Sequence, residues 1–252
     1  DVAYGGREDA LFLEYQPIID ADTDEIFAFE ALARLDGGAL GIVSPGEFIP
    51  LAEESQLIVP IGKQIARKAC AFLRVLEARG HKGHTISINV SAIQLAQDDF
   101  VDEVLEIISE AGIEPSQLCL EITESVFAQN YASINEKLAV LKQVGITIAI
   151  DDFGTGYSSL AREQELNVNC LKIHKSFIDR VTTPEGNQVI AGDIISMAHR
   201  LGHSVVAEGV EQEVQRDYLI KHNCDFLQGF LFSRPVSAAA AVRLLDERYA
   251  RP

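Results

Sequence analysis

Short apolar runs alternate with longer amphipathic stretches over most of the chain. The amphipathic stretches, such as FVDEVLEIISEAG at 100–112 and INEKLAVLKQVG at 134–145, repeat apolar residues at helical spacing and end in glycine, a residue common just past a helix end. Short apolar runs between helices are typical of parallel strands. Six such strands are expected at 85–90, 118–122, 146–150, 170–173, 204–207 and 225–230.

The N-terminal part has a different pattern. Two extended segments, 11–19 and 25–35, flank the turn-like DADTD, which predicts an antiparallel hairpin. A long helical region is expected from Pro45 to about Arg79, ended by Gly80. With the six later strands, the hairpin gives about eight strands, enough to close a modified (β/α)8 TIM-like barrel with an antiparallel first strand.

Length and composition fit one such barrel. The 252 residues, 47% of them hydrophobic and 23% charged, can enclose one large core, so we expect a single barrel domain over residues 1–252. The chain begins at Asp1 and its one methionine is Met197, which suggests a fragment of a larger multidomain protein. No apolar run reaches the roughly 18 residues of a membrane span, so we expect no membrane contact by this domain itself.

The positions of the cysteines indicate the redox state of the compartment in which the chain folds. Four cysteines lie far apart in the sequence, and Cys119 and Cys170 fall within apolar, strand-like runs. A small buried hydrophobic residue is expected at such positions. This favours a reducing cytoplasm, whether the domain stands alone or forms the cytoplasmic part of a membrane-anchored sensor.

The net charge of −17 argues against a DNA or RNA polymer as partner. Affinity for polyanions normally comes from clustered lysine and arginine. An anionic substrate would therefore need a bound metal ion. The alternative is that the negative charge serves solubility alone.

Each of several apolar runs that predict strands ends in a polar or charged residue, which is costly to bury. In a barrel these ends meet at one mouth, where catalytic groups of this fold collect. Five carboxylates gathered there would repel one another unless they took up protons or a cation held them together. Oxygen donors without a His or Cys pair favour Mg²⁺ or Mn²⁺ over Zn²⁺. The residues are Glu30, Asn89, Glu121, Asp151, Asp152, Lys172, Glu208 and Gln228.

Each acidic residue taken singly has another interpretation, because carboxylates at strand ends also cap the helices that follow. That alternative is weakest for Asp151 and Asp152, which stand side by side after the run ITIAI.

Several segments resemble the EAL family of cyclic-di-GMP phosphodiesterases. The resemblance covers about residues 11–235 in the correct order and rests on Glu30-Ala31-Leu32 with Arg34, YQPI from Tyr15, NVS from Asn89, EITES from Glu121, DDFGTGYSSL from Asp151, AEGVE from Ala207 and QGFLFSRP from Gln228. It implies metal-dependent hydrolysis of cyclic di-GMP to linear pGpG, in bacterial second-messenger signalling.

The resemblance also implies roles for individual residues. Metal ligands would be Glu30, Asn89, Glu121 and Asp151, with Asp152 helping to place a second Mg²⁺ or Mn²⁺. Two metal ions can activate water and stabilise the displaced oxygen. Lys172 would neutralise phosphate charge or orient the water, and Glu208 would be the candidate general base. Catalytic roles thus fall on Glu208, Lys172 and Asp152.

Further residues would bind the substrate or support a loop. Gln16, Arg34 and Gln228 resemble substrate contacts, and the planar fork of Arg34 suits a phosphate; without the family context Arg34 can equally form a surface ion pair. Glu124 would hold the DDFGTGYSSL loop. The resemblance suggests a homodimer built partly through that loop.

One position departs from the family pattern. In KIHKSF, His174 stands where the family usually has aspartate. Since side chains alternate along a strand, His174 is expected on the same face as Lys172. It would shift metal preference towards Mn²⁺, because imidazole is a poor Mg²⁺ ligand, or it is a hydrogen-bonded residue without catalytic effect.

Two other functions stay open. One is a catalytically weak or inactive receptor that binds cyclic di-GMP and signals through a partner; the retained carboxylates favour the enzyme, and His174 keeps the receptor possible. The other, independent of the resemblance, is a metal-dependent barrel lyase that uses Lys172 for Schiff-base or enolate chemistry.

Overall fold

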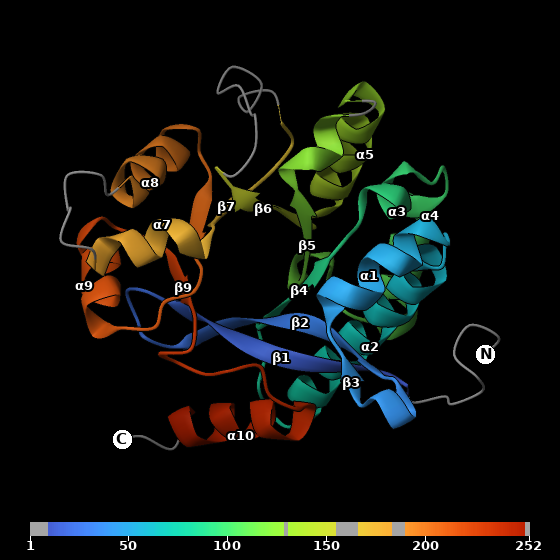
Figure 1. Ribbon diagram of the computed structural model, residues 1–252, viewed down its shortest axis with the longest axis horizontal. Coiled ribbons are helices and arrows are strands. Elements are labelled where there is room, and N and C mark those ends of the chain that lie inside the picture. Colours follow the sequence, from blue (N-terminus) through green and yellow to red (C-terminus); the bar gives the residue numbers. More distant parts are fainter. Residues whose placement is uncertain (1–9, 129–130, 155–165, 183–189, 250–252) are drawn as a thin grey trace.

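The strands of the chain close into one barrel with helices around it (Figure 1). The computed structural model describes residues 10–128, 131–154, 166–182 and 190–249. Neighbouring strands follow the order β1-β9-β8-β7-β6-β5-β4-β2, and pairing of β1 with β2 closes the ring. The strands are β1 (Leu11–Asp20), β2 (Ile26–Asp36), β4 (Thr85–Asn89), β5 (Leu118–Thr123), β6 (Thr147–Phe153), β7 (Cys170–Ile173), β8 (Ser204–Ala207) and β9 (Phe226–Gln228).

The pairing confirms the predicted TIM-like barrel with an antiparallel first strand. β1 is antiparallel to both of its neighbours, β2 and β9. The remaining barrel pairs, from β2–β4 round to β8–β9, are parallel. The turn between β1 and β2 is held by Asp20, whose carboxylate accepts hydrogen bonds from the backbone N–H groups of Asp22 and Thr23, as aspartate does in tight turns. A short strand, β3 (Ile42–Val43), extends the sheet beyond β2.

Helices follow the strands and cover the barrel from outside. They are α1 (Pro45–Glu54), α2 (Ile58–Ala78), α3 (Ala92–Ala96), α4 (Phe100–Ala111), α5 (Tyr131–Val144), α7 (Lys175–Asp179), α8 (Ala191–Arg200), α9 (Glu213–Lys221) and α10 (Ala238–Tyr249). The last of these packs against β1 and lies along the lower edge of Figure 1. Among the described residues, no helix is both long and apolar enough to cross a membrane.

The long N-terminal helix that the sequence predicts is two helices. Between α1 and α2 the chain turns at Gln56, whose φ is 61°, a left-handed conformation that a continuing helix cannot contain. α1 begins with Ser44 and Glu47 in a reciprocal capping box. The break lets α1 and α2 pack as separate elements, and α1 contacts both α2 and β2.

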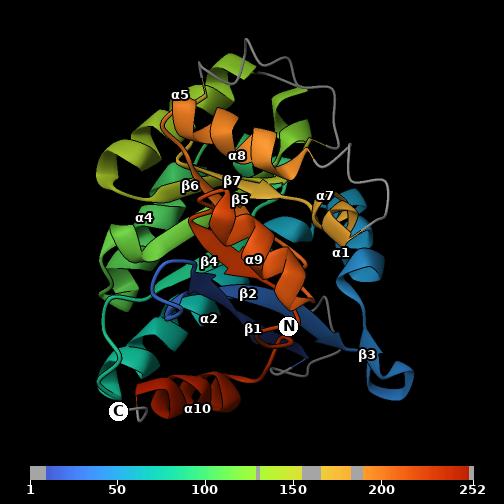
Figure 2. The same cartoon turned by 90° about the vertical axis from the view of Figure 1, so that its left-hand side faces the viewer.

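The barrel has two distinct ends. The arrows of β2 and β7 point towards the side of α1 and α7 (Figure 2), so the carboxyl ends of the parallel strands lie there. The main hydrophobic core fills the layer between strands and helices. A second, small cluster lies apart from that core and consists of Ile18, Ala28, Cys119, Ala149, Cys170 and Val206.

Two turns at the carboxyl end pack without room for a side chain. A Cβ placed on Gly229 would lie 2.1 Å from the carbonyl oxygen of Val210 and 2.3 Å from its nitrogen. That same Val210 nitrogen donates to the carbonyl oxygen of Gln228, at 3.0 Å. The turn after β8 and the turn after β9 therefore fix each other's position.

Gly229→Ala should lower the free energy of unfolding by about 1–3 kcal/mol, because the added methyl group collides with backbone that cannot move aside cheaply. Gly46→Ala is the matched control: a Cβ there meets nothing within 4 Å, and we expect a change within about 0.5 kcal/mol. Urea unfolding followed by circular dichroism measures both. Equal stability of the two variants would contradict the packing described.

Candidate active site

Eight polar side chains form one connected layer at the carboxyl ends of the barrel strands. The two-residue period of a strand turns one residue near each of these ends towards the barrel axis. Hydrogen bonds and ion pairs link all eight. They are Gln16, Glu30, Asn89, Glu121, Asp151, Lys172, Glu208 and Gln228. The layer contains seven of the eight strand-end residues that the sequence singles out, all except Asp152, and Gln16 of β1 in addition.

Lys172 lies at the centre of this layer with its side chain only 1% exposed. Its Nζ is 2.6 Å from Glu121 Oε2 and 2.6 Å from Glu208 Oε1. Two further carboxylates lie slightly farther away, Glu30 at 3.5 Å and Asp151 at 3.6 Å. An isolated buried ammonium is costly, so these four carboxylates keep Lys172 charged in the barrel.

The buried cluster shifts the protonation of its members. Burial lowers the pKa of Lys172, but the surrounding carboxylates outweigh it and raise the pKa well above its usual value. Burial raises the pKa of Glu208 to about 7, against the opposing effect of Lys172. Burial and Glu30 raise the pKa of Glu121 well above its usual range, although Lys172 opposes them. Since four carboxyls surround one ammonium, the metal-free cluster retains protons near neutral pH.

Glu30 is held by two amide side chains. Asn89 Nδ2 donates to Glu30 Oε1 at 2.9 Å, and Gln228 Nε2 donates to Glu30 Oε2 at 2.6 Å. Burial raises the pKa of Glu30, but Lys172 and these two donors outweigh it and the pKa is lowered. Asn89 therefore presents its amide nitrogen to Glu30, and its Oδ1 takes no part in this hydrogen bond.

A second chain of amide contacts reaches the β1 side of the layer. Gln228 Nε2 also donates to Gln16 Oε1 at 3.2 Å, and Gln16 Nε2 donates to the carbonyl oxygen of Ser233 at 3.1 Å. Within the described part of the chain, Gln228 Oε1 is buried and has no hydrogen-bond partner. It is an acceptor that a ligand donor can satisfy.

A β-bulge positions the two adjacent aspartates. The β6–β7 register shifts between Ile150 and Phe153, and Asp152 has φ 55°. Bulges bend a strand and redirect side chains, often beside active sites. Ligand atoms of Asp151, Asp152 and Glu208 consequently lie within 4.8 Å of one another. Three carboxylates at that spacing suit a hard divalent cation.

His174 lies beside this acidic group, at the end of β7. Its Nε2 is 3.8 Å from Asp152 Oδ1. Its Nδ1 accepts a hydrogen bond from the backbone nitrogen of Ser176 at 3.2 Å and caps α7. A neutral imidazole that accepts at Nδ1 carries its proton at Nε2, so in this arrangement His174 presents a donor to Asp152.

Arg34 and Glu124 lie outside the connected layer. Arg34 Nε is paired with Glu14 Oε2 at 2.8 Å, a partner that the sequence analysis did not identify although the β1–β2 hairpin brings the two strands together. In the described part of the chain, both carboxylate oxygens of Glu124 are buried without a hydrogen-bond partner. The loop that Glu124 was expected to hold continues from Gly154 into residues 155–165, which lie outside the described residues.

Part of the polar layer lines an open pocket. A pocket of about 420 Å³ is lined by Gln16, Glu30, Asp152, His174, Glu208 and Gln228 together with neighbouring residues. A larger groove of about 660 Å³ runs beside α1 and α3 and includes Asn89. Both are lined by Leu32, so a ligand larger than the pocket can extend into the groove.

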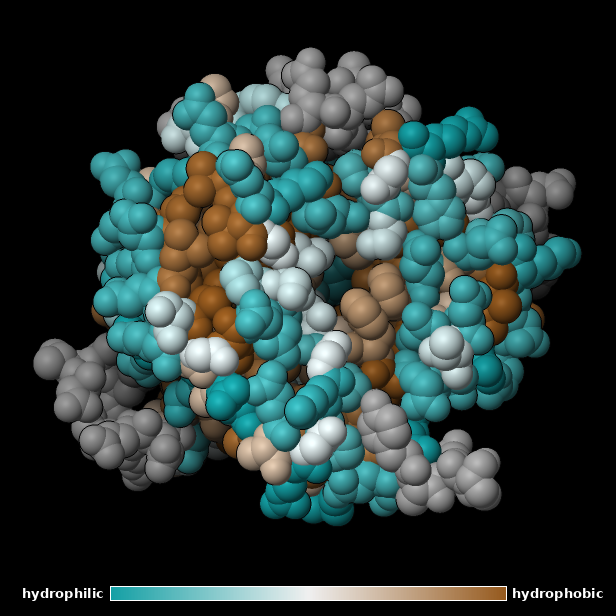
Figure 3. All heavy atoms as spheres, turned by 180° about the vertical axis from the view of Figure 1, so that it is seen from behind, coloured by the Kyte–Doolittle hydropathy of each residue, from teal (hydrophilic) through white to brown (hydrophobic). Residues whose placement is uncertain are grey.

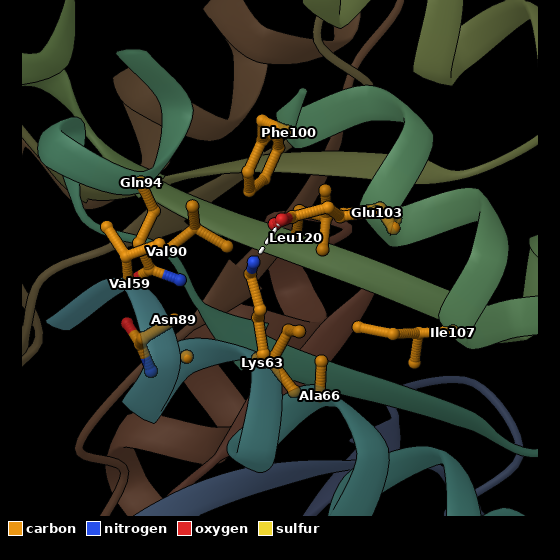
Figure 4. A pocket seen from close by; sticks show the side chains of 13 residues that line it. Val59, Lys63, Ala66, Asn89, Val90, Gln94, Phe100, Glu103, Ile107 and Leu120 are labelled. Atoms are coloured by element: carbon orange, nitrogen blue, oxygen red, sulfur yellow. Dashed lines mark ion pairs between the residues drawn. The ribbon is translucent and has the colours of Figure 1, made fainter. Parts of the chain in front are cut away.

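A third cavity is a packing gap. Figure 4 shows it between α2 and α4, behind Asn89, with Lys63 and Glu103 paired across it. Its volume is about 30 Å³, the space of a single water molecule. It is too small for a nucleotide, so it is not a candidate for the substrate site.

Fold and site together define a class: TIM-like barrel proteins with an acidic mouth around a buried lysine. Residues 3–235 match the family model of the EAL domain, and the chain belongs to this family. It spans well under half of the curated relatives it matches, for example 30% of NbdA and 33% of MucR.

Three relatives illustrate the likeness. The cyclic di-GMP phosphodiesterase NbdA of Pseudomonas aeruginosa is 38% identical over 95% of this chain. MucR of the same organism, a bifunctional diguanylate cyclase/cyclic di-GMP phosphodiesterase, is 39% identical over 90% of it. A solved PaMucR phosphodiesterase in complex with c-di-GMP, 37% identical, has a TM-score of 0.89 and covers 96% of this chain and 98% of its own. BlrP1 of Klebsiella pneumoniae, solved with manganese and cyclic di-GMP, has a TM-score of 0.78 at 27% identity, covering 92% of this chain and 57% of its own.

Lys172→Met should lower the free energy of unfolding of the metal-free protein by about 3–5 kcal/mol, because it leaves the surrounding carboxylates without their cation. Added Mn²⁺ should raise the unfolding midpoint of this variant more than that of the wild type. The control is Lys63→Met, which removes a more exposed pair with Glu103 and should cost at most about 1 kcal/mol. If Lys172→Met in EDTA had the same unfolding midpoint as the wild type, this would contradict the central role of Lys172.

Proposed function

We propose that this chain hydrolyses cyclic di-GMP to linear pGpG in a reaction that depends on a divalent metal, Mg²⁺ or Mn²⁺. The observation that carries the proposal is the gathering of Asp151, Asp152 and Glu208 beside a buried lysine at the barrel mouth. NbdA and PaMucR, which are similar over nearly the whole chain, support the substrate. The manganese and calcium complexes of BlrP1 support a metal ion.

In this proposal the metal ligands are Glu30, Asn89, Glu121, Asp151 and Asp152. A bound pair of divalent ions would activate water and stabilise the departing oxygen. Glu208, with a pKa of about 7 caused by its burial, can accept a proton near neutral pH. Lys172 supplies a fixed positive charge next to the scissile phosphate.

Substrate contacts are assigned to Gln16, Gln228 and Arg34. The unpartnered Oε1 of Gln228 can accept from a guanine N–H group, and the pocket and groove that share Leu32 give room for a dinucleotide. Arg34 Nε is paired with Glu14 and Nη1 donates to the carbonyl oxygen of Ala33, which leaves Nη2 to donate to a phosphate. A homodimer and neighbouring domains in a longer protein are further parts of the proposal.

Purified protein incubated with cyclic di-GMP should form pGpG with Mg²⁺ or Mn²⁺ and none in EDTA, as resolved by chromatography. Glu30→Gln keeps the shape of the side chain but loses its charge, and kcat should fall by at least about 10²-fold. Glu106→Gln, at an exposed position of α4, is the matched control and should keep wild-type turnover. Tight binding of cyclic di-GMP without product would instead identify a receptor.

The role of His174 can be tested through metal dependence. His174→Asp adds a carboxylate beside Asp152, so the Mg²⁺ concentration for half-maximal activity should fall by about 10-fold. His174→Asn is the matched control, because asparagine also caps a helix but adds no charge; its Mg²⁺ requirement should stay close to that of the wild type. Identical Mg²⁺ titrations of all three proteins would show that position 174 does not influence the metal.

A further inference from the structure

The barrel interior below the polar layer is lined by small side chains. On each parallel strand, the residue two positions before the inward-facing polar residue also points towards the barrel axis, because side chains alternate along a strand. These residues are Ala28, Ser87, Cys119, Ala149, Cys170, Val206 and Phe226, on β2 and β4 to β9. TIM barrels usually fill this space with bulky branched residues. Alanine, serine and cysteine leave it hollow.

The hollow is a chamber of about 260 Å³ beneath the catalytic candidates. Glu121 and Lys172 form its roof, and through this buried ion pair the chamber reaches the polar layer. Its lower rim includes Thr85 and Thr147, which are partly exposed at the amino ends of β4 and β6. The chamber therefore runs from the buried layer towards the face opposite the mouth. Figure 3 shows that face, which is hollowed near its centre.

Two aromatic rings stand at the lower rim. Phe27 and Phe226 are stacked with centroids 4.4 Å apart, and both line the chamber. Phe27 is 40% exposed, although a large apolar side chain normally prefers burial. A stacked pair at the entrance of a hollow offers a flat apolar surface to a planar ligand.

The lining of the chamber is uncharged apart from the ion pair of Glu121 and Lys172. Among the described residues that line the chamber, Glu121 and Lys172 alone carry ionisable side chains other than thiols. Burial raises the pKa of Cys170 to about 12 and that of Cys119 well above its usual value, so both thiols are neutral. An engineered apolar cavity of about 150 Å³ binds benzene. This chamber is larger, and its lining also includes uncharged polar side chains, namely Thr85, Ser87, Ser116, Thr147, Asn169 and Ser204.

We propose that this chamber is a second ligand site for a small, uncharged aromatic molecule, separate from the pocket over the polar layer. The volume admits a bicyclic ring, the neutral lining disfavours a charged ligand, and the aromatic rim matches a planar one. A ligand there contacts Glu121 and Lys172 from the chamber side of the polar layer.

Indole is a suitable probe, because the chain contains no tryptophan and the fluorescence of added indole is therefore free of a protein indole signal. We expect a saturable blue shift of indole emission with one site per chain. Ala149→Leu and Cys119→Met fill the chamber and should each weaken binding at least about tenfold. Ala132→Leu makes the same alanine-to-leucine change on the exposed side of α5 and should leave binding unchanged.

The wild-type protein gives a second readout that needs no variant. Cys119 and Cys170 line the chamber, whereas Cys70 and Cys224, also buried and free, do not. Indole should slow the modification of the first two by methyl methanethiosulfonate, measured by mass spectrometry, and leave the other two unaffected. The proposal would be overturned if indole left the modification of Cys119 and Cys170 unchanged, or if neither cysteine were modified even without indole. Loss of indole binding in Phe230→Ala, which alters the upper pocket, would do so as well.

Discussion

The buried ammonium of Lys172 is the interaction on which the arrangement of the barrel mouth depends. Carboxylates from β2, β5, β6 and the end of β8 all lie within 3.6 Å of its Nζ. Removing such charges from water is costly unless they compensate one another. A slip of one residue in β7 would turn Lys172 towards the helices and leave the carboxylates uncompensated. The cluster therefore fixes strand register as well as the chemistry of the mouth.

The same two-residue period that gathers the polar layer also determines what lies beneath it. Cys119 and Cys170 face inward because Glu121 and Lys172 do. The main core lies outside the barrel wall, where branched residues such as Ile86, Ile148 and Val205 are fully buried against helices. Packing between strands and helices can hold the barrel closed while its lower interior stays open.

Much of the fold and of the mouth could be predicted from sequence, because the signals are local. A strand such as 118–122 is a short apolar run, and Glu121 is conspicuous in it as a residue expensive to bury. Other features depend on contacts distant in sequence. The bulge that gives Asp152 a positive φ, the pairing of Arg34 with Glu14 and the amide orientation of Asn89 all follow from neighbouring strands. The turn at Gln56 had no glycine or proline to mark it.

In barrels of this type the mouth is usually the site of chemistry and the opposite end serves stability. That division is incomplete here, because Glu121 and Lys172 line the chamber and also belong to the polar layer, where Lys172 is paired with Glu208 of the pocket. The pKa of Glu121 is raised chiefly by burial, and small side chains such as Cys119 and Ala149 line the chamber below it. A larger residue at position 119 or 149 would press on the ion pair from beneath. The shared pair of Glu121 and Lys172 thus connects packing near the opposite end of the strands with the residues at the mouth.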